Sequence, residues 1–161
     1  MNPLSIREII DAVKGRVISE GSMVEITGVS TDTRTLQAGE LFIPLVGENF
    51  DGHDYLIQAA DKGAAAVLTH NLEKPLPSGI YIIHTENTLT ALQDLAAWYL
   101  KSYNIPVVAV TGSTGKTTTK DMIDSVLSQR FSVLSTKGNF NNEIGLPLTL
   151  FQLEPHHQIA V

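Results

Sequence analysis

A short polar stretch, Gly112-Ser113-Thr114-Gly115-Lys116-Thr117-Thr118, carries the residues of this sequence that are best suited to phosphate chemistry. Glycines let backbone N–H groups approach phosphate oxygens closely, and the N-terminus of a helix adds a positive partial charge. The Lys116 ammonium adds a full charge, and the Thr117 hydroxyl can coordinate Mg²⁺. The stretch therefore predicts binding of ATP or a related nucleotide, with Lys116 as a charge partner of its phosphates and Thr117 as a magnesium ligand.

The flanking elements supply the context that such a loop requires. The apolar, β-branched run Ile105–Val110 predicts a buried strand, and a helical pattern extends from about Lys116 to Gln129. The usual phosphate-binding loop has a glycine six residues before its lysine. Here Val110 occupies that position, so the sequence predicts a shorter loop that starts at Gly112. An ordinary strand-to-helix turn with a solvated lysine is the alternative.

Two further polar clusters stand in the first half of the chain. One is Ser30-Thr31-Asp32-Thr33-Arg34, and the other, Gly47-Glu48-Asn49-Phe50-Asp51-Gly52-His53-Asp54, follows the predicted strand Leu41–Val46. Polar loops that follow strands often bind ligands. Turn chemistry explains both clusters as well, with Asp32 and Arg34 as a surface ion pair and His53 as a hydrogen-bonded loop residue.

A third cluster follows the predicted strand Phe131–Leu134. The segment from Thr136 to Gly145 contains three asparagines, Asn139, Asn141 and Asn142. Open parallel sheets bind ligands beyond the carboxyl ends of their strands, which is where these side chains are expected. An asparagine-rich turn without a ligand is the alternative interpretation.

The elements expected along the chain alternate between strands and helices, which predicts an α/β fold. A capping box at Ser5 and Glu8 begins the first helix, and a break near residues 102–105 separates two domains. We expect a small α/β domain over residues 1–103 and the beginning of a P-loop-type parallel-sheet domain over residues 104–161. The remaining expected strands are 16–18, 25–29, 64–68, 80–83 and one from His157, and the remaining expected helices are 54–62, 88–101 and 146–153.

Composition narrows the class of protein. The 161 residues are 43% hydrophobic and 17% charged, which is typical of a globular chain. The net charge of −6 and the lack of a basic run disfavour a nucleic-acid partner. The sequence has no cysteine, no signal peptide and no apolar run of the roughly 20 residues that span a bilayer. We therefore expect a cytoplasmic protein that is not inserted in a membrane.

Taken in order, the clusters resemble the Mur ligases of bacterial peptidoglycan synthesis. The resemblance includes the short phosphate-binding loop and the motif Gly39-Glu40-Leu41-Phe42. The stretch Gly138–Thr149 is similar in particular to the members that join D-Ala-D-Ala to UDP-MurNAc-tripeptide. Members of the family have a UDP-binding domain, an ATPase domain and a third domain, so the resemblance implies that residues 1–103 bind UDP and that residues 104–161 begin the ATPase.

The resemblance also implies a reaction, in which ATP phosphorylates the carboxylate of the substrate and an amine attacks the acyl phosphate. It implies that Lys116 is the catalytic residue, which binds the β- and γ-phosphates and stabilises charge on the transferring group. It also implies phosphate contacts for the backbone of Gly112–Gly115, with Thr118 supporting Thr117. For the UDP end it implies Ser30, Thr31, Thr33, Gly47, Asn49 and Asp51 as ligands, with Arg34 as a charge partner; Asn139, Asn141 and Asn142 line the passage toward the sugar-peptide part. The family's acidic metal ligand, carbamylated lysine and third domain would follow Val161, so we expect this chain to be the inactive N-terminal part of a longer enzyme.

Three alternatives stay open at this point. The related ligase that adds the third peptide residue shares the early motifs, although the asparagine-rich stretch argues against it. A stand-alone nucleotide-binding module would bind ATP and Mg²⁺ without ligase chemistry. A purely structural α/β domain would not depend on Lys116 at all.

Overall fold

The computed structural model describes residues 1–22, 25–138, 140 and 142–161. Backbone contacts divide the chain into a first unit, Met1–Leu95, and a second unit, Ala96–Val161. The division falls within the long helix α3 (Thr88–Tyr103). None of the described helices is both long enough and apolar enough to cross a bilayer.

The first unit is built on a five-stranded sheet with the order β1-β5-β4-β3-β2. β1 is antiparallel to β5, and the other three pairs are parallel. The α/β fold class predicted from the alternation of elements is therefore confirmed. The strands are β1 (Arg16–Ser19), β2 (Val29–Ser30), β3 (Leu41–Phe42), β4 (Ala66–Thr69) and β5 (Tyr81–His84).

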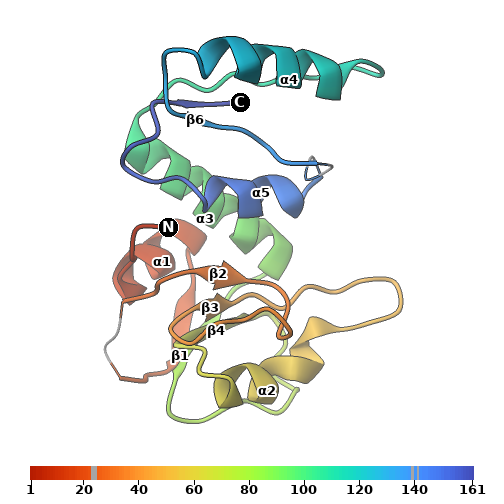
Figure 1. Cartoon of the computed structure of the whole chain (residues 1–161). Helices are drawn as coiled ribbons and strands as arrows, with labels where there is room; N and C mark the ends of the chain where they lie inside the picture. The colour runs from red at the N-terminus through yellow and green to blue at the C-terminus, as the bar shows by residue number, and fades with distance from the viewer. Residues whose placement is uncertain (23–24, 139, 141) are drawn as a thin grey trace. The chain divides into compact units, whose positions relative to one another are not determined.

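The core of the first unit holds this sheet together. All four residues of β4 are buried, as is typical of a parallel strand covered on both faces. Phe42, Leu56 and Val67 pack in one apolar cluster, and α2 (Leu56–Asp61) lies against one side of the sheet (Figure 1). Burial of each such side chain contributes about 1.5–3 kcal/mol. The core thereby fixes the carboxyl ends of the parallel strands.

Capping explains where the helices of the first unit begin. Ser5 accepts a hydrogen bond from the Glu8 N–H, and Glu8 accepts from the Ser5 N–H, so α1 (Ile6–Val13) starts with the predicted capping box. The single helix predicted from Asp54 to Lys62 is instead a 3-10 turn, η1 (Gly52–Tyr55), followed by α2. Asp51 caps η1 because its carboxylate accepts from the His53 N–H.

The segment after β3 does not continue the strand predicted over Leu41–Val46. β3 lies between β2 and β4 and ends before Pro44, which has no N–H to give to a neighbouring strand. From there the chain projects away from the sheet before it returns to η1 (Figure 1). An antiparallel bridge between Val46 and Asp51 closes this projecting loop.

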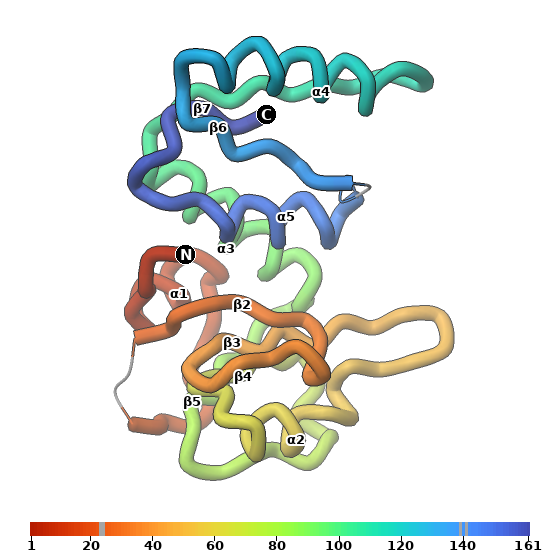
Figure 2. Tube along the Cα trace, in the orientation of Figure 1, coloured from red at the N-terminus to blue at the C-terminus, as the bar shows by residue number. Residues whose placement is uncertain are grey.

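The second unit contains the carboxyl end of α3, two further helices and two strands. Its elements are α4 (Lys116–Leu127), β6 (Val133–Leu134), α5 (Gly145–Leu150) and β7 (Ile159–Ala160). β6 and β7 pair in parallel and run beside each other in Figure 2. As predicted, Pro147 lies in the first turn of a short helix, where its missing N–H costs nothing.

The prediction of a regular, buried strand over Ile105–Val110 is wrong. The run forms a single parallel bridge, between Val107 and Ala160, and Val107 is 50% exposed. The Val108 N–H donates to the Ala160 carbonyl at 2.9 Å, and the Ala160 N–H donates to the Pro106 carbonyl at 3.0 Å. Within the described residues the run pairs along one edge only, which is too little for a regular strand.

Candidate functional site

The loop before α4 has the geometry expected of a phosphate-binding loop. Gly115 is the N-cap of α4 and adopts φ +76°, a left-handed conformation that favours glycine. No side chain in the described part of the chain caps this helix end. The first N–H groups of α4 thus point out of the helix without a capping oxygen, which suits an anion. Residues Thr111–Gly115 are exposed to solvent.

Lys116 is the first residue of α4, and its ammonium turns back onto the loop. Its Nζ donates to the Gly112 carbonyl at 2.5 Å. Lys116 is half-buried, whereas Thr117 and Thr118 on the same turn are exposed. A phosphate bound at the loop would replace the Gly112 carbonyl as the partner of this ammonium.

A cavity of about 280 Å³ lies beside the loop within the second unit. Lys116, Thr117 and Thr136 form part of its polar boundary. Its apolar boundary includes Leu134 and Leu150, from β6 and α5. The cavity beside the loop therefore has cationic and hydroxyl groups on its polar side.

The magnesium prediction rests on Thr117 alone in this chain. Among the described residues, no group of three or more His, Asp or Glu side chains could hold a metal ion. The nearest carboxylate along α4, Asp121, pairs with Lys120 at 2.7 Å. Magnesium often binds through few protein ligands together with phosphates and water, so a single hydroxyl fits that type of site.

The two polar clusters of the first unit lie at one edge of the sheet. β2 and β3 are parallel neighbours, and the Ile43 N–H donates to the Ser30 carbonyl at 2.9 Å. The residues that follow Ser30 and those of the projecting loop therefore leave adjacent strands at the same end. Ligands of parallel sheets bind at such carboxyl edges.

Most side chains of the first cluster already have partners within it. Ser30 is buried, and its hydroxyl donates to the Asp32 carbonyl at 3.0 Å. Asp32 accepts from the Arg34 backbone N–H at 2.8 Å and from its guanidinium at 2.6 Å. These side-chain and backbone hydrogen bonds from Arg34 lower the pKa of Asp32 to about 2. The expected ion pair is present, and its Arg34 side chain is 87% exposed.

Thr33 and Thr31 differ in what they offer a ligand. The Thr33 hydroxyl is buried and donates to Gln58 Oε1 at 2.8 Å, and the Thr33 carbonyl accepts from Lys62. Thr31 is half-buried and lies between Ser30 and Asp32, which hydrogen bonds hold in the turn. The cluster is therefore a rigid turn in which Thr31 and Arg34 are the more accessible of the predicted ligands.

The predicted ligands of the projecting loop lie at its tip and base. The Gly47 N–H donates to the Phe50 carbonyl at 2.9 Å, and a Cβ at Gly47 would meet the Phe50 ring at 2.3 Å. Asn49 is exposed at the tip. Glycine at position 47 thus lets the Phe50 ring lie against the backbone while Asn49 faces solvent.

Asp51 and His53 form the base of the projecting loop. Asp51 Oδ1 lies 2.6 Å from His53 Nδ1 and accepts from the His53 N–H at 2.9 Å. Burial of the Asp51 carboxyl favours its neutral form, but these bonds from His53 outweigh burial and the pKa is lowered. The His53 ring is fully buried, and its Nε2 accepts from the His70 N–H. The centroids of the His53 and His70 rings lie 4.3 Å apart in an edge-on arrangement. His53 is thus the hydrogen-bonded residue that turn chemistry predicted.

The third cluster is described only in part. Asn139 and Asn141 lie outside the described residues. Asn142 Oδ1 accepts from the Ile144 N–H at 3.2 Å and from the Gly145 N–H at 2.6 Å. The Asn142 side chain therefore closes the turn that leads into α5, whose N-cap is Ile144.

Sequence reasoning missed Lys120. Its Nζ donates to the Thr136 carbonyl at 2.6 Å, and Lys120 shares the cavity boundary with Lys116. The available signal was helical spacing, because residues four apart on a helix lie on one face. Its partner, a backbone carbonyl 16 residues away, has no sequence signature.

Fold and loop together define an α/β protein that has a phosphate-binding type of loop before a helix. The model of the Mur ligase family catalytic domain matches residues 25–100, and the model of the Mur ligase middle domain matches residues 110–161. The chain belongs to the Mur ligase family.

Curated relatives named UDP-N-acetylmuramoyl-tripeptide–D-alanyl-D-alanine ligase are similar along the whole chain. The protein from Bacillus subtilis is 47% identical over 98% of this chain and 35% of its own length. The protein from Escherichia coli is 39% identical over 100% of this chain and 34% of its own length. The chain thus spans about a third of the length of these relatives.

Solved structures agree with this family. MurF from Acinetobacter baumannii superimposes with a TM-score of 0.91 at 34% identity, over 100% of this chain and 35% of that one. MurF ligase from Thermotoga maritima, solved in complex with ADP, matches with a TM-score of 0.75 at 34% identity, over 83% of this chain and 31% of that one. The resemblance to Mur ligases is confirmed.

Proposed function

We propose that the whole protein is an ATP-dependent ligase that joins D-Ala-D-Ala to UDP-MurNAc-tripeptide. The observation that carries this proposal is similarity along the whole chain to relatives that are named for that reaction. We further propose that residues 1–103 bind the UDP end and that residues 104–161 begin the ATP-binding domain. We place the protein in the cytoplasm, where its co-substrate ATP is available.

The proposed reaction proceeds in two steps. A carboxylate oxygen of the tripeptide attacks the γ-phosphorus of ATP, so the bond to the β-phosphate oxygen breaks and ADP leaves. The amine of D-Ala-D-Ala then attacks the acyl carbon, the amide bond forms, and inorganic phosphate leaves as the amine loses a proton. Such catalysis depends on positioning and on neutralisation of phosphate charge.

The loop before α4 supplies that neutralisation in our proposal. Backbone N–H groups of Gly112–Gly115 and the uncapped start of α4 hold phosphate oxygens. Lys116 exchanges its bond to the Gly112 carbonyl for the β- and γ-phosphates. Thr117, supported by Thr118, provides a hydroxyl for Mg²⁺, which when bound would neutralise phosphate charge.

The carboxyl edge of the first unit receives the UDP end in our proposal. Thr31, Arg34 and Asn49 have the most accessible side chains of the predicted ligands, whereas those of Ser30, Thr33 and Asp51 are engaged in the turns that shape the edge. Gly47 would contribute backbone groups of the projecting loop. Asn139, Asn141 and Asn142 are proposed to line the passage toward the sugar-peptide part.

An acceptor screen with the full-length protein tests this proposal. Purified protein, ATP, Mg²⁺ and UDP-MurNAc-tripeptide are incubated with D-Ala-D-Ala or with free diamino acids, and amide formation is followed by mass spectrometry. We expect product with D-Ala-D-Ala only. Lys116→Ala should abolish it, while Lys101→Ala, an exposed lysine of α3, serves as the matched control.

Each alternative gives a different result when the screen is repeated with the shorter UDP-MurNAc-dipeptide as well. Ligation of a diamino acid to this dipeptide would identify the ligase that adds the third residue. ATP binding with no amide product would identify a nucleotide-binding module. If Lys116→Ala and the parent protein both lacked amide product and ATP binding, the chain would be a purely structural domain.

A further inference from the structure

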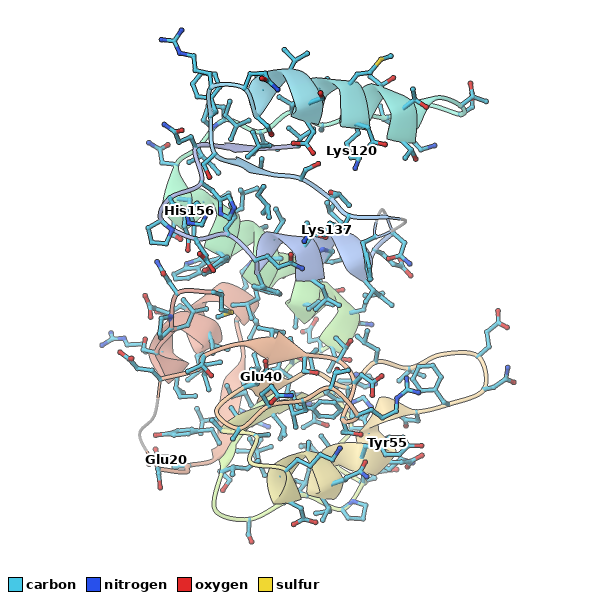
Figure 3. The ribbon with its side chains drawn as sticks, viewed as in Figure 1. Glu20, Glu40, Tyr55, Lys120, Lys137 and His156 are labelled. Atoms are coloured by element: carbon cyan, nitrogen blue, oxygen red, sulfur yellow. The ribbon has the colours of Figure 1, made fainter. Side chains whose placement is uncertain are left out.

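Lys120 makes a contact that joins α4 to the end of β6. Its Nζ donates to the Thr136 backbone carbonyl at 2.6 Å and lies 2.7 Å from Asp121 Oδ1. Figure 3 shows Lys120 on the side of α4 that is turned toward the strands. The side chain is only 17% exposed, which is unusual for lysine and indicates that the contact is built into the packing.

Lys120 and Lys116 stand one helical turn apart on the same face of α4. The two ammonium groups border the same cavity, but each bonds to a different backbone carbonyl. Lys116 bonds to the Gly112 carbonyl, inside its own loop, whereas Lys120 bonds across to Thr136. Lys116 thus bonds within the phosphate-binding loop, whereas Lys120 connects α4 to the residue that follows the end of β6.

Thr136 is the point at which the segment after β6 is anchored. Its N–H donates to the Val161 carbonyl at 3.0 Å, and its carbonyl accepts from Lys120. Lys120 therefore fixes the start of the stretch that the sequence predicts to face the sugar-peptide part of the substrate.

We propose that Lys120 is a positioning residue that fixes Thr136, where the stretch proposed to contact the sugar-peptide part begins, and so sets the affinity for the nucleotide-sugar substrate. The inference rests on the proposed function and adds a residue that acts through Thr136 on the substrate. Because Lys120 bonds across to Thr136 and not within the phosphate-binding loop, we assign ATP binding to Lys116 and the loop. An ammonium-to-carbonyl bond is charge-assisted, so its loss should be felt strongly.

The test compares Lys120→Met, Lys120→Arg and the control Lys101→Met in the full-length protein, with KM for ATP and for UDP-MurNAc-tripeptide measured separately. Lys120→Met should raise KM for UDP-MurNAc-tripeptide about 10-fold, the change that loss of one such bond produces. KM for ATP should change less than about 2-fold. Lys120→Arg should restore most of the affinity, since a guanidinium can also donate to the Thr136 carbonyl.

Hydrogen exchange gives a second readout that does not need activity. In the full-length protein, amides of residues 133–138 should exchange faster in Lys120→Met than in Lys120→Arg or Lys101→Met. Kinetics and exchange of Lys120→Met that match Lys101→Met would overturn the inference. An equal rise of both KM values would also overturn it, because Lys120 would then contact phosphate directly.

The same experiment separates this inference from the proposed function. If the parent protein forms no amide with D-Ala-D-Ala, the proposed function fails. The exchange comparison then decides the role of Lys120 alone: faster exchange supports the anchor at Thr136, and unchanged exchange contradicts it.

Discussion

The first unit and the second unit prepare their polar residues in opposite ways. At the carboxyl ends of β2 and β3, the side chains of Ser30, Thr33 and Asp51 bond to a neighbouring backbone carbonyl or to side chains of α2 and η1, over a buried core. In the loop before α4, the hydroxyls and glycines face solvent, and α4 has no buried residue.

The two candidate sites would therefore bind their ligands in different ways. The edge of the first unit is already shaped, so a ligand would meet fixed groups and lose little entropy of the protein on binding. The loop of the second unit satisfies Lys116 with its own Gly112 carbonyl and must exchange that bond for a phosphate. We therefore expect ligand affinity at the edge of the first unit to depend on the packing that shapes it. Ligand affinity at the loop before α4 should depend on the charge of Lys116.

Core truncation should give the largest contrast between the units. Phe42→Ala, in the core of the first unit, should lower the free energy of unfolding by about 3–5 kcal/mol because it leaves a cavity. Met122→Ala on α4, where Met122 is 65% exposed, should change it by less than about 0.5 kcal/mol. Urea denaturation followed by circular dichroism measures both, and equal losses would break the comparison.

Removal of the His53 ring should give an intermediate effect. His53→Ala leaves the Asp51 carboxylate and the His70 N–H without their buried partner, so we expect a loss of about 1–3 kcal/mol. Glu48→Gln, an exposed position of the same loop, is the matched control. Thermal and urea denaturation of the two variants would contradict the account if they gave the same stability.

Sequence patterns predicted local features of both units well. The capping box at Ser5 and the alternation of strands and helices were sufficient for α1 and for the fold class. An apolar run has the same composition whether or not it has neighbouring strands on both sides. The sequence therefore could not reveal that, within the described residues, Ile105–Val110 pairs on one edge only.

For the polar clusters of the candidate sites, sequence patterns predicted the location but not the hydrogen-bond partners. Their types and spacing indicated loops at strand ends, and β2 and β3 do end together. The partners that hold them were not predictable, since Thr33 bonds to Gln58 and Lys120 to Thr136 across 25 and 16 residues. Such contacts depend on the packing of helices, which local sequence does not specify.

The smallest expected effect is a pH dependence in the first unit. Burial, helped by the nearby His53 and His84 and opposed by Asp51, lowers the pKa of His70. The unfolded chain therefore takes up a proton first, and the free energy of unfolding should fall as pH drops below about 6.5 toward that lowered pKa.

Denaturation at pH 7.5 and 5.5 measures this effect. His70→Gln should flatten the dependence relative to the parent chain. Lys101→Met, at an exposed position of α3, should leave it unaltered. A slope that persists in His70→Gln would place the titrating group elsewhere.

The most direct test of the central claim is a single-turnover measurement of ADP formation by the full-length protein and its Lys116→Met variant. We predict that the variant binds UDP-MurNAc-tripeptide with unchanged Kd and forms ADP at least about 100-fold more slowly, because the charge that stabilises the transferring phosphoryl group is gone. ADP formation within a few-fold of the parent protein would contradict the account.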